Sequence, residues 1–319
     1  MTHSTSAAAN GWLALLGRHG ARAIALSVFA GVGLPPLAAW CRPLFVPSLF
    51  LLMCLAFLRV DPHEARARIV RPGLVVIAAI WIMVVVPALI GAALIVTGTD
   101  TAAPGLFAAL IFQAAAPPVI SSAALAALIG LDAALALVTL IVCTAATPLT
   151  ATLYAAFLVG PSVPISAGAL GLKLVAMLAG AAVVAAVARR SVGSEFIERQ
   201  AQRIDGINVI LLFVFVVALM DGVAANAIAQ PKLVLGLTAL AFALSFGLTG
   251  ITALLFARAG VPAAFALGVG AGSRNMGLMF AAAAGAMPEI AWLYLALAQF
   301  PIYLTPLLVR RLARRFSRA

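Results

Sequence analysis

The chain has 319 residues, of which 65% are hydrophobic and only 9% are charged, and its formal net charge is +11. A soluble globular domain carries about 25% charged residues, so this composition excludes that class and indicates a polytopic membrane protein. In such a protein a surplus of basic residues reports topology, and we therefore predict no nucleic-acid partner from the charge.

In chain order, the first twenty residues are polar and alanine-rich, and the apolar run after them continues into further spans without a convincing cleavage site. We predict no removable signal peptide. Stretches long enough to cross about 30 Å of hydrocarbon then recur along the chain. The ten predicted spans are 22–41, 44–59, 72–97, 104–129, 133–159, 164–188, 206–228, 232–257, 262–285 and 289–309.

Basic residues gather at alternate ends of these spans. Most of the twenty Lys and Arg residues fall on one side when the N-terminus is placed inside, including the arginine-rich stretch 310–318. Arg42 and Lys232 are the two expected in or beside outer loops. The positive-inside rule therefore predicts an even number of spans with both termini cytoplasmic.

The two halves of the chain share a plan. Spans one to five begin inside and spans six to ten begin outside, so repeats over 22–159 and 164–314 would be inverted. In each half the fourth span is interrupted, at Pro117-Pro118 and at 270–274. We predict an all-α polytopic membrane protein, a single transporter domain over 1–319, with ten transmembrane helices in two inverted five-helix repeats and broken, crossing helices 4 and 9.

The glycine-rich stretch 268–277 carries a full charge, Arg274, at membrane depth. Such a charge costs several kcal/mol unless it is paired, which favours a functional role. Two interpretations stay open: Arg274 pairs with an anionic substrate, or it forms an internal ion pair, for which Asp221 is the candidate. Three roles stay open for Asp221: the counter-ion of Arg274, a proton-coupling group, or a residue near the interface that is hydrated from the outer side. The last is favoured.

Other polar residues near the interruptions or at mid-span complete the candidate site. The half-helices that follow the breaks present N–H groups and positive dipole ends, which suit an anion. With Arg274, the substrate-binding candidates are Asn275, Ser121, Ser122, Gln113 and Gln299, and the helix-breaking residues are Pro117, Pro118, Gly270, Gly272 and Gly277. We find no HExxH, GxSxG or P-loop motif and no histidine in a span, so neither an enzyme, a resident metal nor an ATP-driven pump is predicted.

At the two interruptions the chain resembles the bile acid:sodium symporter family, over nearly its whole length and as a divergent bacterial-type member. The ninth-span pattern of the family is matched by Gly272, Asn275, Gly277 and Leu278, and the fourth-span pattern by Pro117 and Ser122. The resemblance implies a panel domain from 22–59 and 164–228 and a core domain from 72–159 and 232–309. It also implies a substrate cavity between them and transport by alternating access.

The chain departs from this family where the family binds sodium. Gly270 and Arg274 stand in place of the sodium-binding Glu and Gln, and Ala123 in place of a sodium-ligating Asn. A hard cation needs oxygen ligands, and a neighbouring arginine repels it. No cofactor is predicted, and Na⁺ is not supported by the residues at the expected site.

The predicted function is secondary transport of a small organic anion, with Arg274 pairing the substrate charge. Asn275, Ser121 and Ser122 would supply hydrogen bonds. One alternative is a sodium symporter that builds a different site from backbone carbonyls at the breaks. Another is a non-transporting membrane receptor or scaffold with the same fold. The lipid bilayer and the anion are the predicted partners.

Overall fold

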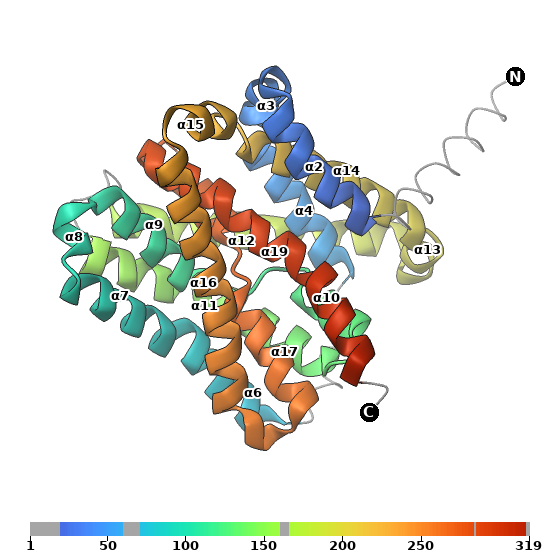
Figure 1. Cartoon of the computed structure of the whole chain (residues 1–319). Coiled ribbons are helices and arrows are strands. Elements are labelled where there is room, and N and C mark those ends of the chain that lie inside the picture. The colour runs from blue at the N-terminus through green and yellow to red at the C-terminus, as the bar shows by residue number, and fades with distance from the viewer. Residues whose placement is uncertain (1–19, 60–70, 160–165, 284, 317–319) are drawn as a thin grey trace, which may run out of the picture. The chain divides into compact units, whose positions relative to one another are not determined.

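The computed structural model describes residues 20–59, 71–159, 166–283 and 285–316, and all regular elements among them are helices (Figure 1). Six helical segments in these residues are long and apolar enough to cross a membrane. They are Pro35–Arg59, Pro72–Val96, Ala133–Val159, Ala167–Val192, Ala201–Ala229 and Pro231–Leu255. The chain is therefore a helical integral membrane protein.

The remaining predicted spans are short or interrupted in the structure. The first contains α2 (Gly20–Gly33), the fourth is divided into α9 (Pro104–Ala115) and α10 (Ser122–Leu128), and the ninth into α17 (Val261–Gly272) and α18 (Met276–Ala282). The tenth lies in α19 (Glu289–Phe316). The fourth and ninth spans thus each have non-helical backbone in the middle of an apolar stretch.

The predicted C-terminal end of the first span is wrong. We expected one helix over 22–41, but α2 ends at Gly33 and α3 (Pro35–Cys41) begins two residues later. Leu34 has φ −125° and ψ 71°, outside the helical region. Two consecutive prolines follow it, and a proline disfavours helical backbone at the residue before it. The helical run then continues without a break to Arg59.

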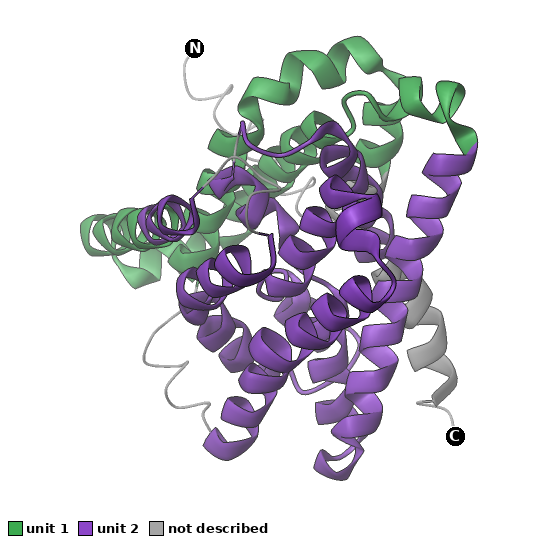
Figure 2. Cartoon of the chain, turned by 90° about the vertical axis from the view of Figure 1, so that its left-hand side faces the viewer, with its two compact units in different colours: residues 1–61, 177–231 green, residues 62–176, 232–319 purple. Residues whose placement is uncertain are grey.

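The chain divides into two compact units, residues 1–61 with 177–231 and residues 62–176 with 232–319 (Figure 2). The division crosses α12 (Ala167–Val192) between Ala176 and Met177. The first unit includes 22–59 and 177–228 of the predicted panel ranges, and the second includes the predicted core ranges 72–159 and 232–309 together with 164–176.

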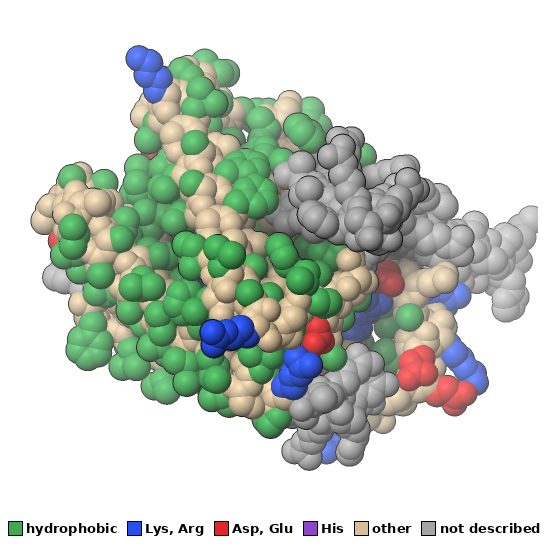
Figure 3. All heavy atoms as spheres, turned by 60° about the horizontal axis from the view of Figure 1, so that its bottom comes forward, with side chains coloured by type: hydrophobic (Ala, Val, Ile, Leu, Met, Phe, Trp, Pro, Cys, Tyr) green, Lys and Arg blue, Asp and Glu red, His purple; other side chains and the backbone are tan. Residues whose placement is uncertain are grey.

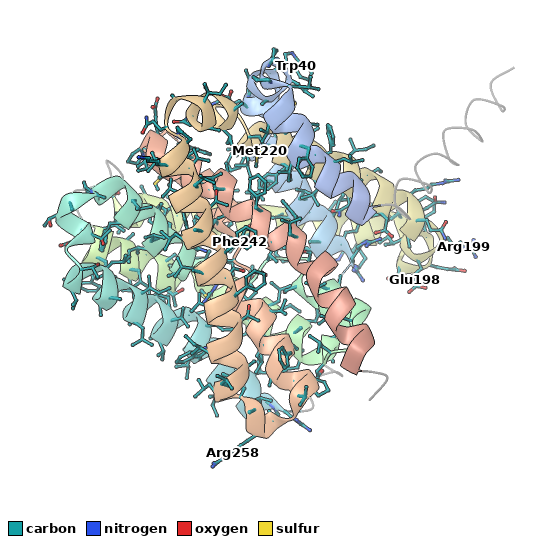
Figure 4. All side chains as sticks on the ribbon, in the orientation of Figure 1. Trp40, Glu198, Arg199, Met220, Phe242 and Arg258 are labelled. Atoms are coloured by element: carbon teal, nitrogen blue, oxygen red, sulfur yellow. The ribbon has the colours of Figure 1, made fainter. Side chains whose placement is uncertain are left out.

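The first unit is organised around α14 (Ala201–Leu219), which packs against α2, α3 and α4 (Phe45–Arg59). The rings of Phe45 and Phe215 stack with centroids 5.3 Å apart. Gly31 allows α2 to lie close to the C-terminal end of α14. A Cβ added at Gly31 would lie 2.6 Å from Cβ of Met220, which is labelled in Figure 4. The unit also contains η1 (Arg42–Leu44), α13 (Ser194–Arg199) and α15 (Val223–Ala229).

The second unit contains the interrupted helices. Its core helix is α11 (Ala133–Tyr154), which packs against α6 (Pro72–Ile80), α10 and α17, while α9 packs against α7 (Val86–Val96) and α19. A π-helical turn, η2 (Trp81–Val85), joins α6 to α7. The other elements are α8 (Thr99–Ala102), η3 (Ala155–Val159), α16 (Pro231–Leu255), η5 (Ala257–Ala259) and the first part of α12.

Small residues allow α17 to pack closely on α16. A Cβ added to Gly268 would lie 2.6 Å from the carbonyl oxygen of Thr249, and one added to Gly272 would overlap the carbonyl oxygen of Ser245. This is the small-xxx-small spacing that brings backbones together in membranes. The close packing holds the C-terminal end of α17, where the interruption begins, against a long helix.

Large apolar side chains cover much of the visible surface (Figure 3). Phe157 is 82% exposed, Val96 87% and Leu254 78%. In water each such side chain would cost about 1.5–3 kcal/mol relative to burial, whereas in hydrocarbon it costs nothing. Trp40 on α3 is also largely exposed and projects outward (Figure 4), as aromatic residues do at membrane interfaces.

Candidate functional site

The candidate site is the place where the two interrupted segments meet. After α9 the backbone becomes extended at Ala116, with φ −68° and ψ 148°, because Pro117 and Pro118 cannot continue a helix. After α17 it becomes extended at Ser273, with φ −111° and ψ 98°. No proline is present there, and the glycine content of 268–272 weakens the helix instead.

The two extended segments pair as a short antiparallel bridge between Pro118 and Arg274. The N–H of Val119 donates to the carbonyl of Ser273 at 2.8 Å, and the N–H of Asn275 donates to the carbonyl of Pro117 at 2.8 Å. Pro118 and Arg274 are the pair without mutual hydrogen bonds, so the missing N–H of Pro118 costs no bond. Each interruption therefore supplies partners for the backbone groups that the other has freed.

Arg274 is 1% exposed, and three backbone carbonyl oxygens surround its guanidinium group. Its Nε donates to Ala271 at 2.6 Å. Its Nη1 donates to Ala116 at 2.9 Å and to Ile82 at 3.1 Å, and its Nη2 donates to Ile82 at 3.2 Å. Four of the five N–H groups that an arginine carries are used in this way.

Two of these carbonyls are free because they belong to helix ends. Ala271 lies in the last turn of α17, and Ala116 directly follows α9. The last four carbonyls of a helix have no partner within it, and the negative end of the helix dipole lies there. Two helix C-termini thus converge on one cation.

The third carbonyl is free because of a proline. Within the π-helical turn the N–H of Val86 donates to Trp81 and not to Ile82. The next residue, Pro87, has no N–H to donate. Ile82 is therefore left with a buried acceptor that the guanidinium of Arg274 satisfies.

The ion pairs among the described residues do not include Arg274. Asp221, the expected counter-ion candidate, instead forms an ion pair with Arg42 at 2.9 Å within the first unit. It lies between α14 and α15, and its side chain is 21% exposed. Its hydration from the outer side of the membrane stays a prediction.

The other predicted residues are divided between the crossing and the helices beside it. Ser121 is exposed and precedes α10, Ser122 is 2% exposed, and Asn275 is 9% exposed and precedes α18. Their side chains form no hydrogen bond with another described residue. Ser273, which is 3% exposed, is a further polar side chain at the crossing.

Gln113 and Gln299 are engaged away from the backbone bridge. The hydroxyl of Tyr294 donates to Oε1 of Gln113 at 2.5 Å, joining α19 to α9. Gln299 donates to the carbonyl of Leu295 in its own helix at 3.0 Å. Gly270 lies within α17, Gly272 ends it, and Gly277 lies in α18. Among these, Gly272 is the residue placed at the break itself.

Sequence reasoning missed the partners of Arg274 and two polar side chains. Thr139 on α11 is 3% exposed, and its hydroxyl has no partner among the described residues. Tyr294 is fully buried against Gln113. Pro87, in the middle of the third span, is the sequence signal that could have indicated a free carbonyl a few residues before it.

Comparisons with protein-family models and with curated proteins gave no match. The function is therefore inferred from the chemistry of the crossing.

Proposed function

We propose that the chain is a secondary transporter that moves a small organic anion across a bacterial inner membrane by alternating access. The antiparallel pairing of two interrupted helices around a buried arginine carries this proposal. Non-helical backbone at membrane depth is tolerated only inside protein or along a watery cavity. Broken helices with converging termini are the means by which many transporters build a substrate site.

Asn275, Ser121 and Ser122 are the proposed hydrogen-bonding contacts of the anion. Their side chains flank the bridge, and no other described residue forms a hydrogen bond with them. Arg274 supplies the positive charge that favours an anion at this place. Since carbonyls already use four of its N–H groups, the remaining N–H on Nη2 is the one through which direct pairing with a substrate would occur.

We also propose that the two compact units correspond to the panel and core domains implied by the resemblance to bile acid:sodium symporters. Ten spans in two inverted repeats, with both termini cytoplasmic, complete this proposal. The division of the chain into two units of discontinuous sequence supports it, since alternating access requires two bodies.

Sodium coupling is not part of the proposal. The sodium-symporter alternative would use carbonyls at the breaks as ligands. Those of Ala271 and Ala116 accept hydrogen bonds from Arg274, and those of Pro117 and Ser273 accept from backbone N–H groups. Gly270 offers no side-chain oxygen at the position where the resembling family has a carboxylate.

Uptake of organic anions into proteoliposomes, with and without a sodium gradient, tests the proposal. We expect saturable uptake of at least one carboxylate at the same initial rate in both conditions. Strict dependence on sodium would favour the sodium-symporter alternative. Binding of a carboxylate without any flux, detected as thermal stabilisation in detergent, would favour the receptor or scaffold.

A further inference from the structure

We propose that the guanidinium group of Arg274 fills a cation-binding site built from backbone carbonyls, so that the chain carries its own cation at the helix crossing. The ligands are the carbonyl oxygens of Ala271, Ala116 and Ile82. This inference rests on those contacts alone, and it holds whether or not the chain transports an anion.

The three carbonyls form a site that requires a cation. They come from the last turn of α17, from the residue that follows α9, and from η2, so three separate segments direct acceptors at one point. Two of them lie at helix C-termini, where the dipole favours positive charge. Rings of carbonyl oxygens are also the ligands with which channels hold monovalent cations. Without a cation, buried acceptors would face one another in a medium that offers no donors.

An arginine suits this site better than a point charge does. Its planar group carries donors in several directions, and here they reach one residue three positions away and two others 158 and 192 positions away in sequence. A single side chain thus links α17, α9 and η2. The crossing is consequently assembled without a soluble cation, and removal of the side chain leaves a vacant monovalent-cation site.

Replacement of Arg274 by lysine and by methionine separates charge from volume, since these two side chains are similar in size. We expect the thermal unfolding temperature in detergent to fall in the order wild type, Arg274→Lys, Arg274→Met, with lysine at least about 4 °C above methionine. A methionine variant as stable as the lysine variant, or more so, would overturn the requirement for a cation. This comparison tests the requirement for a cation even if Arg274→Ala does not fold.

Chemical rescue tests the site itself. Millimolar guanidinium chloride, far below denaturing concentrations, should raise the unfolding temperature of Arg274→Ala by about 4 °C or more and leave the wild type unchanged. Urea at the same concentration and choline chloride at the same ionic strength should have no effect. Phe107→Ala, which removes another buried side chain of the second unit, should not respond. A folded Arg274→Ala protein that guanidinium does not stabilise, or that it stabilises no more than Phe107→Ala, would overturn the site.

Discussion

At the scale of single residues, the pair of Arg42 and Asp221 contrasts with Arg274. Its side chains are 68% and 21% exposed, and exposed ion pairs contribute about 0–1 kcal/mol. We therefore expect Asp221→Asn to lower the free energy of unfolding by less than about 1 kcal/mol and to leave the pH dependence of uptake unchanged. Arg42→Gln is the matched control. Loss of pH-dependent uptake in Asp221→Asn alone would instead identify Asp221 as a proton-coupling group.

The buried pair of Gln113 and Tyr294 should behave differently. Tyr294→Phe removes the hydroxyl and leaves Oε1 of Gln113 without its donor at a position that is 6% exposed. The expected loss is about 1–3 kcal/mol of unfolding free energy, measured by thermal denaturation. Replacement of both residues, as Tyr294→Phe with Gln113→Leu, should restore part of that loss. Equal stability of Tyr294→Phe and wild type would show that the hydrogen bond is not important.

At the scale of elements, the packing of α17 on α16 depends on two glycines. Gly268→Ala and Gly272→Ala would place a Cβ against the carbonyls of Thr249 and Ser245. These are backbone atoms of a helix, so they cannot rotate away as a flexible side chain could. We expect each to lower the unfolding free energy by about 1–3 kcal/mol.

Gly247→Ala is the control for this prediction. Gly247 lies on the partner helix α16, and no atom lies within 4 Å of the Cβ that the substitution would add. Its stability should be unchanged or raised by up to about 1 kcal/mol, as alanine favours a helix. Similar thermal stability of Gly268→Ala and Gly247→Ala would contradict the close contact between α16 and α17.

Much of the crossing can be predicted from local sequence. Pro117 and Pro118 interrupt one helix, and Pro35 and Pro36 follow the end of another. The partners of Arg274 could not be predicted in the same way, because backbone carbonyls have no sequence signature. They depend on which helix ends converge, and that is a property of the tertiary fold. Pro87 gives the one local indication, and only for Ile82.

At the scale of the whole molecule, the second unit alone contains the bridge, Arg274 and its three carbonyl partners. The crossing is therefore a property of one compact body and not of a particular arrangement of the two. Under the proposed function, we expect the carbonyl contacts of Arg274 and the backbone bridge to stay unchanged through the transport cycle while one unit moves against the other. Accessibility of Ser121 and Asn275, not the carbonyl contacts of Arg274, should then differ between states.

The most direct measurement is the initial rate of organic-anion uptake in sodium-free proteoliposomes by wild type and by Asn275→Ala. Loss of one hydrogen bond to a charged ligand costs about 1.5–3 kcal/mol, so uptake should fall at least about tenfold. Asn226→Ala is the control: it lies on α15 in the first unit, is partly buried and donates to the carbonyl of Gly222 at 2.9 Å, and its uptake should match the wild type. Wild-type uptake that requires sodium, or uptake that Asn275→Ala and Asn226→Ala affect equally, would contradict a sodium-independent anion site at the crossing.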